Sequence, residues 1–147
     1  MKIKREEVIK TVKAVAPELA QRYDLQLIIL FGSYAKNEKW SLSDIDIAIS
    51  FQQSYLRKKR LQQKLDIMQE LSQILGIEEI DLVVLEEAKP ALKFLIFKSG
   101  VMLFEATPGL VEDFLVKALS EYYDNRIFLE SQFLAAQAYL DRVTMHE

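Results

Sequence analysis

The sequence contains no cysteine and only one histidine among its 147 residues. Without cysteine, the chain cannot form a disulfide framework, build a cysteine-ligated zinc finger or use a thiol nucleophile. The one histidine, His146, lies where we expect a frayed tail, so it is not a candidate for catalysis.

Long hydrophobic runs are also missing. No apolar stretch approaches the ~18 residues typical of a membrane span, and the longest, residues 25–31, is interrupted by Gln26. The basic N-terminal residues are not followed by the apolar core of a secretory signal. We therefore expect a soluble, cytoplasmic protein without a membrane partner.

The chain has no excess of positive charge. Nineteen Lys and Arg residues stand against 22 Asp and Glu, for a net charge of −3, so direct nucleic-acid binding is not expected. A local basic patch, Arg57–Arg60 with Lys64, is best interpreted as a solvated helix face opposite Leu61 and Leu65. An acidic partner surface, a triphosphate or RNA are the alternatives for this patch.

Glycine and proline are scarce, with four and three residues, and there is no repeat or flexible linker. The length fits one domain, residues 1–147, with a core over about 1–106 and a C-terminal helical segment over about 109–143. Hydrophobic periodicity predicts an α/β fold, a small mixed twisted sheet flanked by helices. The expected strands are 25–31, 44–50, 80–85 and 101–105, and the expected helices are one from Arg5 that Pro17 bends or restarts, 55–75 stopped by Gly76, and 91–98 closed by Gly100.

The segment from about residue 110 to 143 is expected to form one long helix or two joined ones. Its apolar face is wider than the roughly 100° stripe of a helix that packs only on its own core. Two interpretations stay open: part of this face binds a partner, or the segment wraps a small sheet. Its aromatic residues Tyr122, Tyr123 and Tyr139 are interpreted as core residues.

The most informative stretch is Gly32-Ser33, followed after ten residues by Asp44-Ile45-Asp46. Since side chains alternate along a strand, Asp44 and Asp46 point the same way while Ile45 faces the core. Two carboxylates on a half-buried strand repel each other unless a cation lies between them. Mg²⁺ is the hard, oxygen-seeking cation that suits such ligands and a phosphate-bearing substrate.

Gly32 and Ser33 supply a complementary element. Glycine at a strand end lets backbone approach a ligand closely, and Ser33 at a helix start can hold phosphate oxygens. Asp81 is a lone acid in the apolar strand 80–85. If that strand lies beside the Asp-x-Asp strand, Asp81 can reach the same cations and orient the attacking hydroxyl. The pattern is the minimum apparatus for transfer from a nucleoside triphosphate.

These residues resemble the signature of the DNA polymerase β-type nucleotidyltransferases, and within them the minimal nucleotidyltransferases (MNT) encoded beside HEPN-domain proteins. The specific match consists of Gly32, Ser33, Asp44, Asp46 and Asp81. The chain departs from the family after Gly-Ser, where the common Arg-Ala-Arg-Gly is replaced by Tyr34-Ala35-Lys36-Asn37. Lys36 keeps a positive charge for phosphate contact but loses the bidentate geometry of arginine.

The resemblance implies a polymerase β-like fold and two Mg²⁺ ions, with ATP as substrate. Asp44, Asp46 and Asp81 would be catalytic metal ligands, and Gly32, Ser33 and Lys36 would bind the phosphates. It further implies an antitoxin that transfers AMP to a tyrosine hydroxyl of a cognate HEPN RNase toxin, in a hetero-oligomer with that toxin. Two alternatives stay open: a non-catalytic antitoxin that acts by occlusion, and a small-molecule adenylyltransferase like the aminoglycoside-modifying enzymes.

Overall fold

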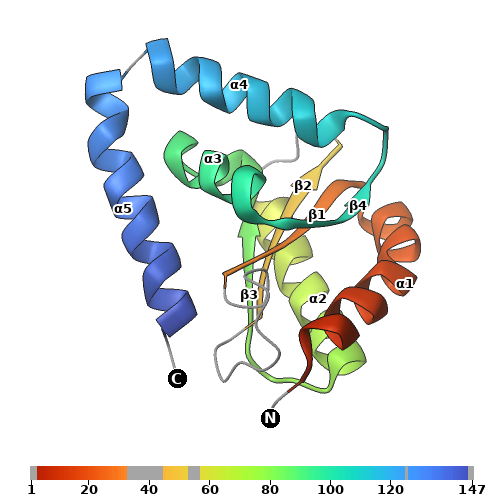
Figure 1. The fold of residues 1–147 in the computed structure, drawn as a ribbon. Coiled ribbons are helices and arrows are strands. Elements are labelled where there is room, and N and C mark those ends of the chain that lie inside the picture. The colour runs from red at the N-terminus through yellow and green to blue at the C-terminus, as the bar shows by residue number, and fades with distance from the viewer. Residues whose placement is uncertain (1–2, 33–44, 53–56, 125, 146–147) are drawn as a thin grey trace.

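The structure, a computed structural model, describes residues 3–32, 45–52, 57–124 and 126–145. A four-stranded sheet forms the middle layer, with helices on both faces (Figure 1). In chain order the elements are α1 (Arg5–Tyr23), β1 (Leu25–Phe31), β2 (Ile45–Phe51), α2 (Arg57–Leu75), β3 (Ile80–Val84), η2 (Leu85–Glu87), α3 (Pro90–Ser99), β4 (Val101–Glu105), α4 (Leu110–Asp124) and α5 (Arg126–Met145). The predicted mixed α/β architecture is confirmed.

The sheet has the strand order β3-β2-β1-β4. β1 lies in the middle and pairs antiparallel with both β2 and β4, while β2 and β3 are parallel. Parallel neighbours require a crossover connection, and α2 supplies it between β2 and β3. This pairing brings the Asp-x-Asp strand next to the strand that carries Asp81.

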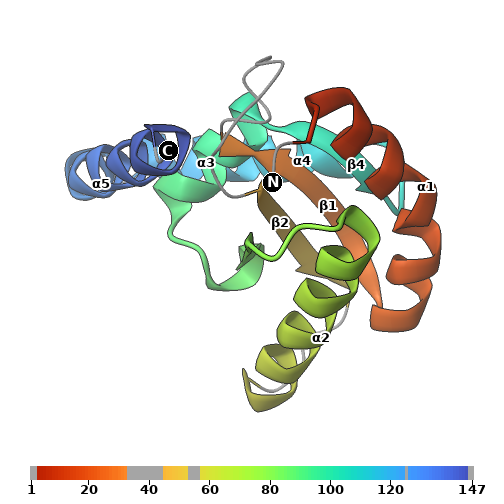
Figure 2. The same ribbon diagram turned by 90° about the horizontal axis from the view of Figure 1, so that it is seen from below.

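The two faces of the sheet bury different clusters of apolar side chains. One face, which we call the α1/α2 face, is covered by α1 and α2, and residues such as Ile47 and Ile49 pack into it. The other, the α3/α5 face, is covered by α3 with α4 and α5, and residues such as Ala48 and Ile29 pack into it. Seen from below, the helices of the two groups lie on opposite sides of the strands (Figure 2).

α1 runs without interruption from Arg5 to Tyr23 although Pro17 lies inside it. The predicted restart at Pro17 is therefore wrong. Proline removes one helical hydrogen bond, but the residues on both sides of it, Ala16 and Leu19, are buried against the sheet. Tertiary packing holds the helix together across the missing bond.

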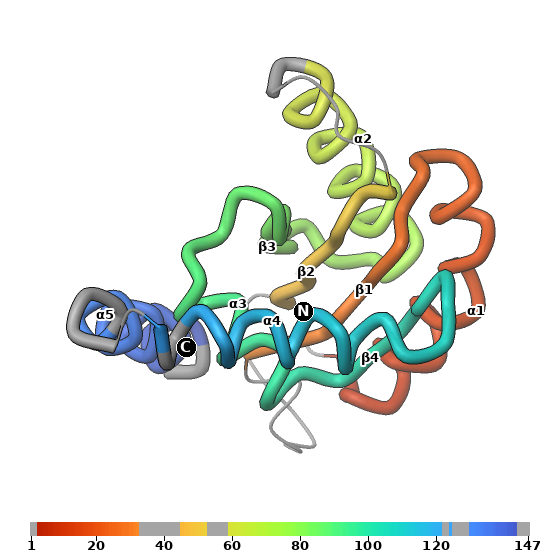
Figure 3. Tube along the Cα trace, turned by 90° about the horizontal axis from the view of Figure 1, so that it is seen from above, coloured from red at the N-terminus to blue at the C-terminus, as the bar shows by residue number. Residues whose placement is uncertain are grey.

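α2 ends as predicted at Gly76, whose φ of +68° suits glycine and whose N–H donates to the Ser72 carbonyl at 2.9 Å. The apolar face expected for its first half is wrong: Leu61 and Leu65 are 56% and 50% exposed. Only the second half of α2 lies against the sheet, and the first half projects beyond it (Figure 3). The core residues come from the second half: Ile67, Leu71 and Leu75.

The C-terminal segment forms two helices, which settles the choice between one and two. α3 packs against both α4 and α5, so it lies between them and the sheet. Stacked rings of Phe97 and Phe114, 5.5 Å apart, join α3 to α4, and Phe94 and Phe133, 6.1 Å apart, join α3 to α5. None of the described helices is both long and apolar enough to cross a bilayer.

Candidate active site

Asp46 lies near the start of β2, with its side chain on the α3/α5 face. Ile45 and Ile47, its neighbours along the strand, point to the opposite face and are fully buried. Asp46 is itself only 1% exposed, although it is a carboxylate. The strand is therefore buried on both faces rather than half-buried as predicted, because α3 and α5 also cover the face that was expected to be open.

Asp81 lies beside Asp46 on the neighbouring strand. The parallel register of β2 and β3 pairs the two residues directly, so their side chains project from the same face of the sheet. Asp81 is exposed where Asp46 is buried. The pair thus joins one carboxylate held inside the protein to one that solvent or a ligand can reach.

Gly32, at the end of β1, lies next to Asp46. It directly follows Phe31, the register partner of Asp46, and it has a φ of +77°. A Cβ on Gly32 would overlap with Oδ2 of Asp46 and lie 3.1 Å from its Cγ. Only glycine therefore lets the backbone after β1 lie against the buried carboxylate.

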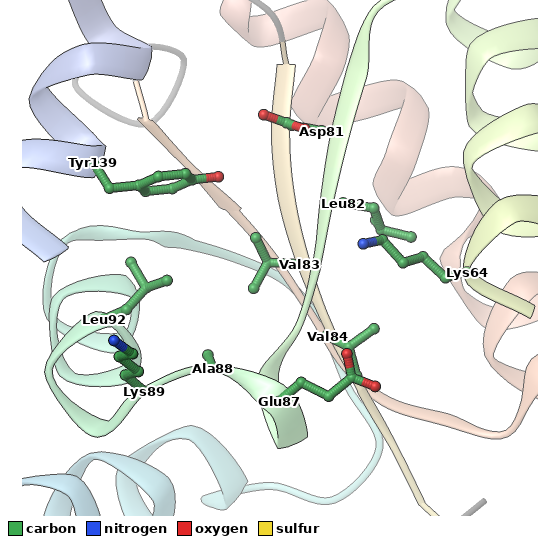
Figure 4. A pocket seen from close by; sticks show the side chains of 10 residues that line it. All are labelled: Lys64, Asp81, Leu82, Val83, Val84, Glu87, Ala88, Lys89, Leu92 and Tyr139. Atoms are coloured by element: carbon green, nitrogen blue, oxygen red, sulfur yellow. The ribbon is translucent and has the colours of Figure 1, made fainter. Parts of the chain in front are cut away.

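A pocket of about 430 Å³ opens beside Asp81, the exposed member of the acid pair (Figure 4). Asp81 and Val83 line it from β3, Lys89 and Leu92 from the start of α3, and Tyr139 from α5. The volume is within the range of pockets that hold small ligands. The pocket joins the face carrying the carboxylates to the C-terminal helices.

Tyr139 was interpreted as a core residue; it packs, partly buried, against the apolar cluster of the α3/α5 face, and it also lines this pocket. Burial raises the pKa of its phenol to about 12, with further contributions from the negative charges of Asp81 and Asp46. Tyr139 thus lies within electrostatic range of both acids. No sequence signal distinguished it from other helical tyrosines, because its position depends on how α5 packs on α3.

Glu86 is a second residue that sequence reasoning missed. Its Oε1 accepts hydrogen bonds from the Phe51 N–H at 2.6 Å and the Ser50 hydroxyl at 3.2 Å, at the far end of β2 from Asp46. Burial raises the pKa of Glu86, and the two hydrogen bonds oppose that shift. Glu86 therefore helps to hold in place β2, the strand that carries Asp46.

The basic patch predicted at the start of α2 is partly engaged within the protein. Nε of Arg60 lies 3.1 Å from Oε2 of Glu87, and the Arg60 side chain is only 19% exposed. Lys64 lines the edge of the pocket. These two residues are therefore not simply a solvated face, since one pairs with an acid of η2 and the other borders the candidate site.

The structure brings together three of the predicted site residues: Gly32, Asp46 and Asp81. The other three, Ser33, Lys36 and Asp44, lie outside the described residues. In the part of the chain that is described, no group of three or more acidic or histidine side chains forms a metal cluster. The described contribution to a cation site is thus the pair Asp46 and Asp81.

Comparison with known sequences connects this corner of the sheet to a family. The family model "Polymerase beta, Nucleotidyltransferase" matches residues 13–108, which include all six predicted site residues. Among curated proteins, "Putative protein adenylyltransferase MJ0128" from Methanocaldococcus jannaschii is 40% identical over 45% of this chain and 62% of its own length. MJ0435, a protein of the same name and organism, is 30% identical over 63% of this chain and 95% of its own length. The chain spans less than two thirds of MJ0128 and 46% of a further such protein, MJ0126.

Solved structures extend the likeness to the C-terminal helices. A crystal structure of a toxin–antitoxin with AMP-PNP superposes with a TM-score of 0.66 at 27% identity, covering 85% of this chain and 98% of that one. The MNT antitoxin in complex with a tri-AMPylated HEPN toxin of Shewanella oneidensis gives 0.62 at 25% identity, covering 88% and 98%. The chain therefore belongs to the polymerase beta nucleotidyltransferase family, and its fold is that of the MNT antitoxins.

Proposed function

We propose that this protein is a Mg²⁺-dependent adenylyltransferase that moves AMP from ATP to a tyrosine hydroxyl of a cognate HEPN RNase toxin, and so acts as its antitoxin. One observation carries the proposal: Asp46 and Asp81 are register partners on parallel strands, and the Gly32 backbone lies against the Asp46 carboxylate. The acid pair would hold the cation, and the segment that begins at Gly32 is proposed to bind the phosphates; these are the two elements that nucleotidyl transfer requires.

The residues fit a hard divalent cation. Asp46 and Asp81 offer carboxylate oxygens from one face of the sheet, the type of ligand that Mg²⁺ prefers. Two carboxylates in register repel each other, and one of them is almost completely buried, so a cation between them offsets both costs. Asp44 is proposed as the third ligand, one strand-alternation step before Asp46. When bound, Mg²⁺ would lower the pKa of the acceptor hydroxyl and neutralise charge on the phosphates.

Each residue has a proposed role in the transfer. Gly32 and Ser33 hold the β- and γ-phosphates through the backbone, and Lys36 pairs with a phosphate oxygen. The acceptor oxygen forms a bond to the α-phosphorus while the bond from that phosphorus to the bridging β-oxygen breaks, and pyrophosphate leaves. Asp81, the exposed member of the pair, orients the acceptor hydroxyl and receives its proton.

The nature of the acceptor rests on the relatives. A complex that contains an AMPylated HEPN toxin, and another solved with AMP-PNP, support a protein acceptor and an ATP-like donor. α4 and α5 are the proposed docking surface, because they cover the α3/α5 face at which the pocket opens. Val116 of α4 and Leu134 of α5 are 67% and 70% exposed, so apolar side chains of both helices are available to a partner.

The test is incubation of the purified protein with Mg²⁺, ATP and the HEPN protein encoded beside it, followed by intact mass measurement of both chains. We expect AMP-sized increments on the HEPN chain, mapped to tyrosine, and none with the Asp44→Asn variant or when EDTA replaces Mg²⁺. A stable complex that rescues cells without any increment would replace this proposal with occlusion. Rescue by a variant lacking all three carboxylates would do the same.

A further inference from the structure

Tyr139 brings a hydroxyl of this chain to the face of the sheet that carries the acid pair. It lines the same pocket as Asp81. In the close-up, the phenol of Tyr139 points from α5 across the pocket toward the strands, and the Asp81 carboxylate points from β3 toward the side on which Tyr139 lies (Figure 4). An acceptor hydroxyl for nucleotidyl transfer has to approach from this direction, because it must come near Asp81.

The helix that presents Tyr139 is packed firmly on the rest of the protein. Its neighbours along α5, Ala136 and Leu140, are only 6% and 4% exposed. The ring of Phe133, one helical turn before Ala136, lies 6.1 Å from the ring of Phe94 on α3. The phenol is therefore held in place beside the acids, and a group held next to a reactive centre reacts with the advantage of an intramolecular step.

Electrostatics agree with this placement. Burial chiefly raises the pKa of Tyr139, and the negative charges of Asp81 and Asp46 raise it further.

We propose that Tyr139 is an AMP acceptor within this chain, so that the protein AMPylates itself in cis. The inference rests on the adenylyltransferase activity proposed above. The phenolic oxygen forms a bond to the α-phosphorus of ATP, the bond from that phosphorus to the bridging β-oxygen breaks, and pyrophosphate leaves. The phenolic proton passes to Asp81 and from there to solvent, and the product is a tyrosyl–AMP phosphodiester.

A basic residue lies where it can stabilise that product. The guanidinium carbon of Arg142 is 5.2 Å from the centroid of the Tyr139 ring, one helical turn further along α5. A phosphodiester on the phenol carries one negative charge, and a guanidinium pairs well with phosphate oxygens. Arg142 therefore offers the modified side chain a counter-ion from the same helix.

The experiment uses the purified full chain, without a partner, incubated with Mg²⁺ and ATP. We expect a single AMP-sized mass increment, mapped by peptide sequencing to Tyr139, and a first-order rate that stays constant over roughly a hundredfold dilution of the protein. Tyr139→Phe, which removes only the hydroxyl, is expected to lose the increment. Tyr23→Phe is the matched control, because Tyr23 is the last residue of α1, at the opposite end of β1 from Gly32, and its hydroxyl donates a hydrogen bond to Glu70. This variant is expected to keep the increment.

A parallel reaction with the HEPN partner separates the two proposals. AMP on the partner but none on this chain would overturn the inference and leave the proposed function standing. An increment that maps to another residue, persists in Tyr139→Phe or slows on dilution would also overturn it. AMP on neither chain would contradict the proposed function itself, and the inference with it.

Discussion

The two faces of the sheet use the same strands for different purposes. On the α1/α2 face, Ile45, Ile47 and Ile49 of β2 are fully buried among apolar side chains. On the α3/α5 face, the same strand presents Asp46, Ala48 and Ser50, two of which are the buried polar residues of the described chain. Alternation along a strand thus lets one six-residue segment serve a core on one side and a site on the other.

The difference shows where stability and chemistry are separable. A buried apolar side chain is stabilising by roughly 1.5–3 kcal/mol, whereas a buried carboxylate beside another carboxylate is a cost that a bound cation offsets. Truncation of the buried isoleucines of β2 on the α1/α2 face is therefore expected to change unfolding, and substitution of Asp46 on the α3/α5 face to change transfer. The following variants test that separation.

The largest effect is expected from Asp46→Asn. Losing one carboxylate of the pair removes charge that would otherwise hold the cation, so AMP transfer should fall at least about a hundredfold. Thermal unfolding without Mg²⁺ should show no large loss of stability, because the variant removes a buried charge and its repulsion with Asp81. A variant that unfolds easily, or one that retains full transfer, would mean that the two faces are not separable at this position.

Ile47→Ala changes the residue that follows Asp46 on β2, whose side chain lies on the α1/α2 face. It deletes a side chain that is 0% exposed and leaves a cavity, so we expect a loss of about 2–5 kcal/mol in the free energy of unfolding. The transfer rate per folded molecule should stay close to that of the natural protein. Leu65→Ala on the projecting half of α2 is the control, with an expected change within about 0.5 kcal/mol because Leu65 is 50% exposed. Chemical denaturation measures both.

Gly32→Ala tests a residue at which both stability and AMP transfer are expected to change. Its φ of +77° and the overlap of a Cβ with Asp46 should cost about 1–3 kcal/mol of stability. Because the Asp46 carboxylate must move to make room, transfer should also fall. Gly76→Ala, at φ +68° but with nothing near its Cβ, is the matched control: a similar backbone strain with transfer unchanged. Equal loss of transfer in both variants would contradict the role of the close approach.

The smallest effect concerns pH. The folded state raises the pKa of Glu86 above its ordinary value of 4.5, so the folded protein holds this proton more tightly than the unfolded chain. The stability it contributes is present below pH 4.5 and is lost as the pH rises through the folded pKa. Relative to Glu86→Gln, whose amide oxygen can still accept the Phe51 N–H, the natural protein should therefore become less stable over this interval. Unfolding curves at a series of pH values measure the difference, and parallel curves would contradict it.

Local patterns were sufficient for most of the fold. β1 and β4 begin and end at the predicted residues, and Gly76 and Gly100 stop their helices as expected. Local patterns also predicted the acid pair. Asp81 is the one charged residue in its apolar strand, and a helix long enough for a crossover precedes that strand. A helix of that length permits the two strands to be parallel neighbours, and the structure shows that they are.

What failed depended on distant packing. Periodicity identifies which residues share a helix face, but not how far the helix extends past the sheet, so it did not show that Leu61 and Leu65 of the apolar face are exposed. The break expected at Pro17 ignored the buried residues that flank it. Tyr139 enters the site only because α5 packs on α3, and no local pattern carries that information.

The strand order also has a consequence for synthesis of the protein on the ribosome. Gly32, Asp46 and Asp81 all precede β4, the strand that closes the remaining edge of β1, and α4 and α5 are translated afterwards. At about 5–20 residues per second, the ribosome needs a few more seconds to deliver those helices. We therefore expect a nascent chain in which the strands that carry Asp46 and Asp81 can pair while the pocket still lacks its α5 wall.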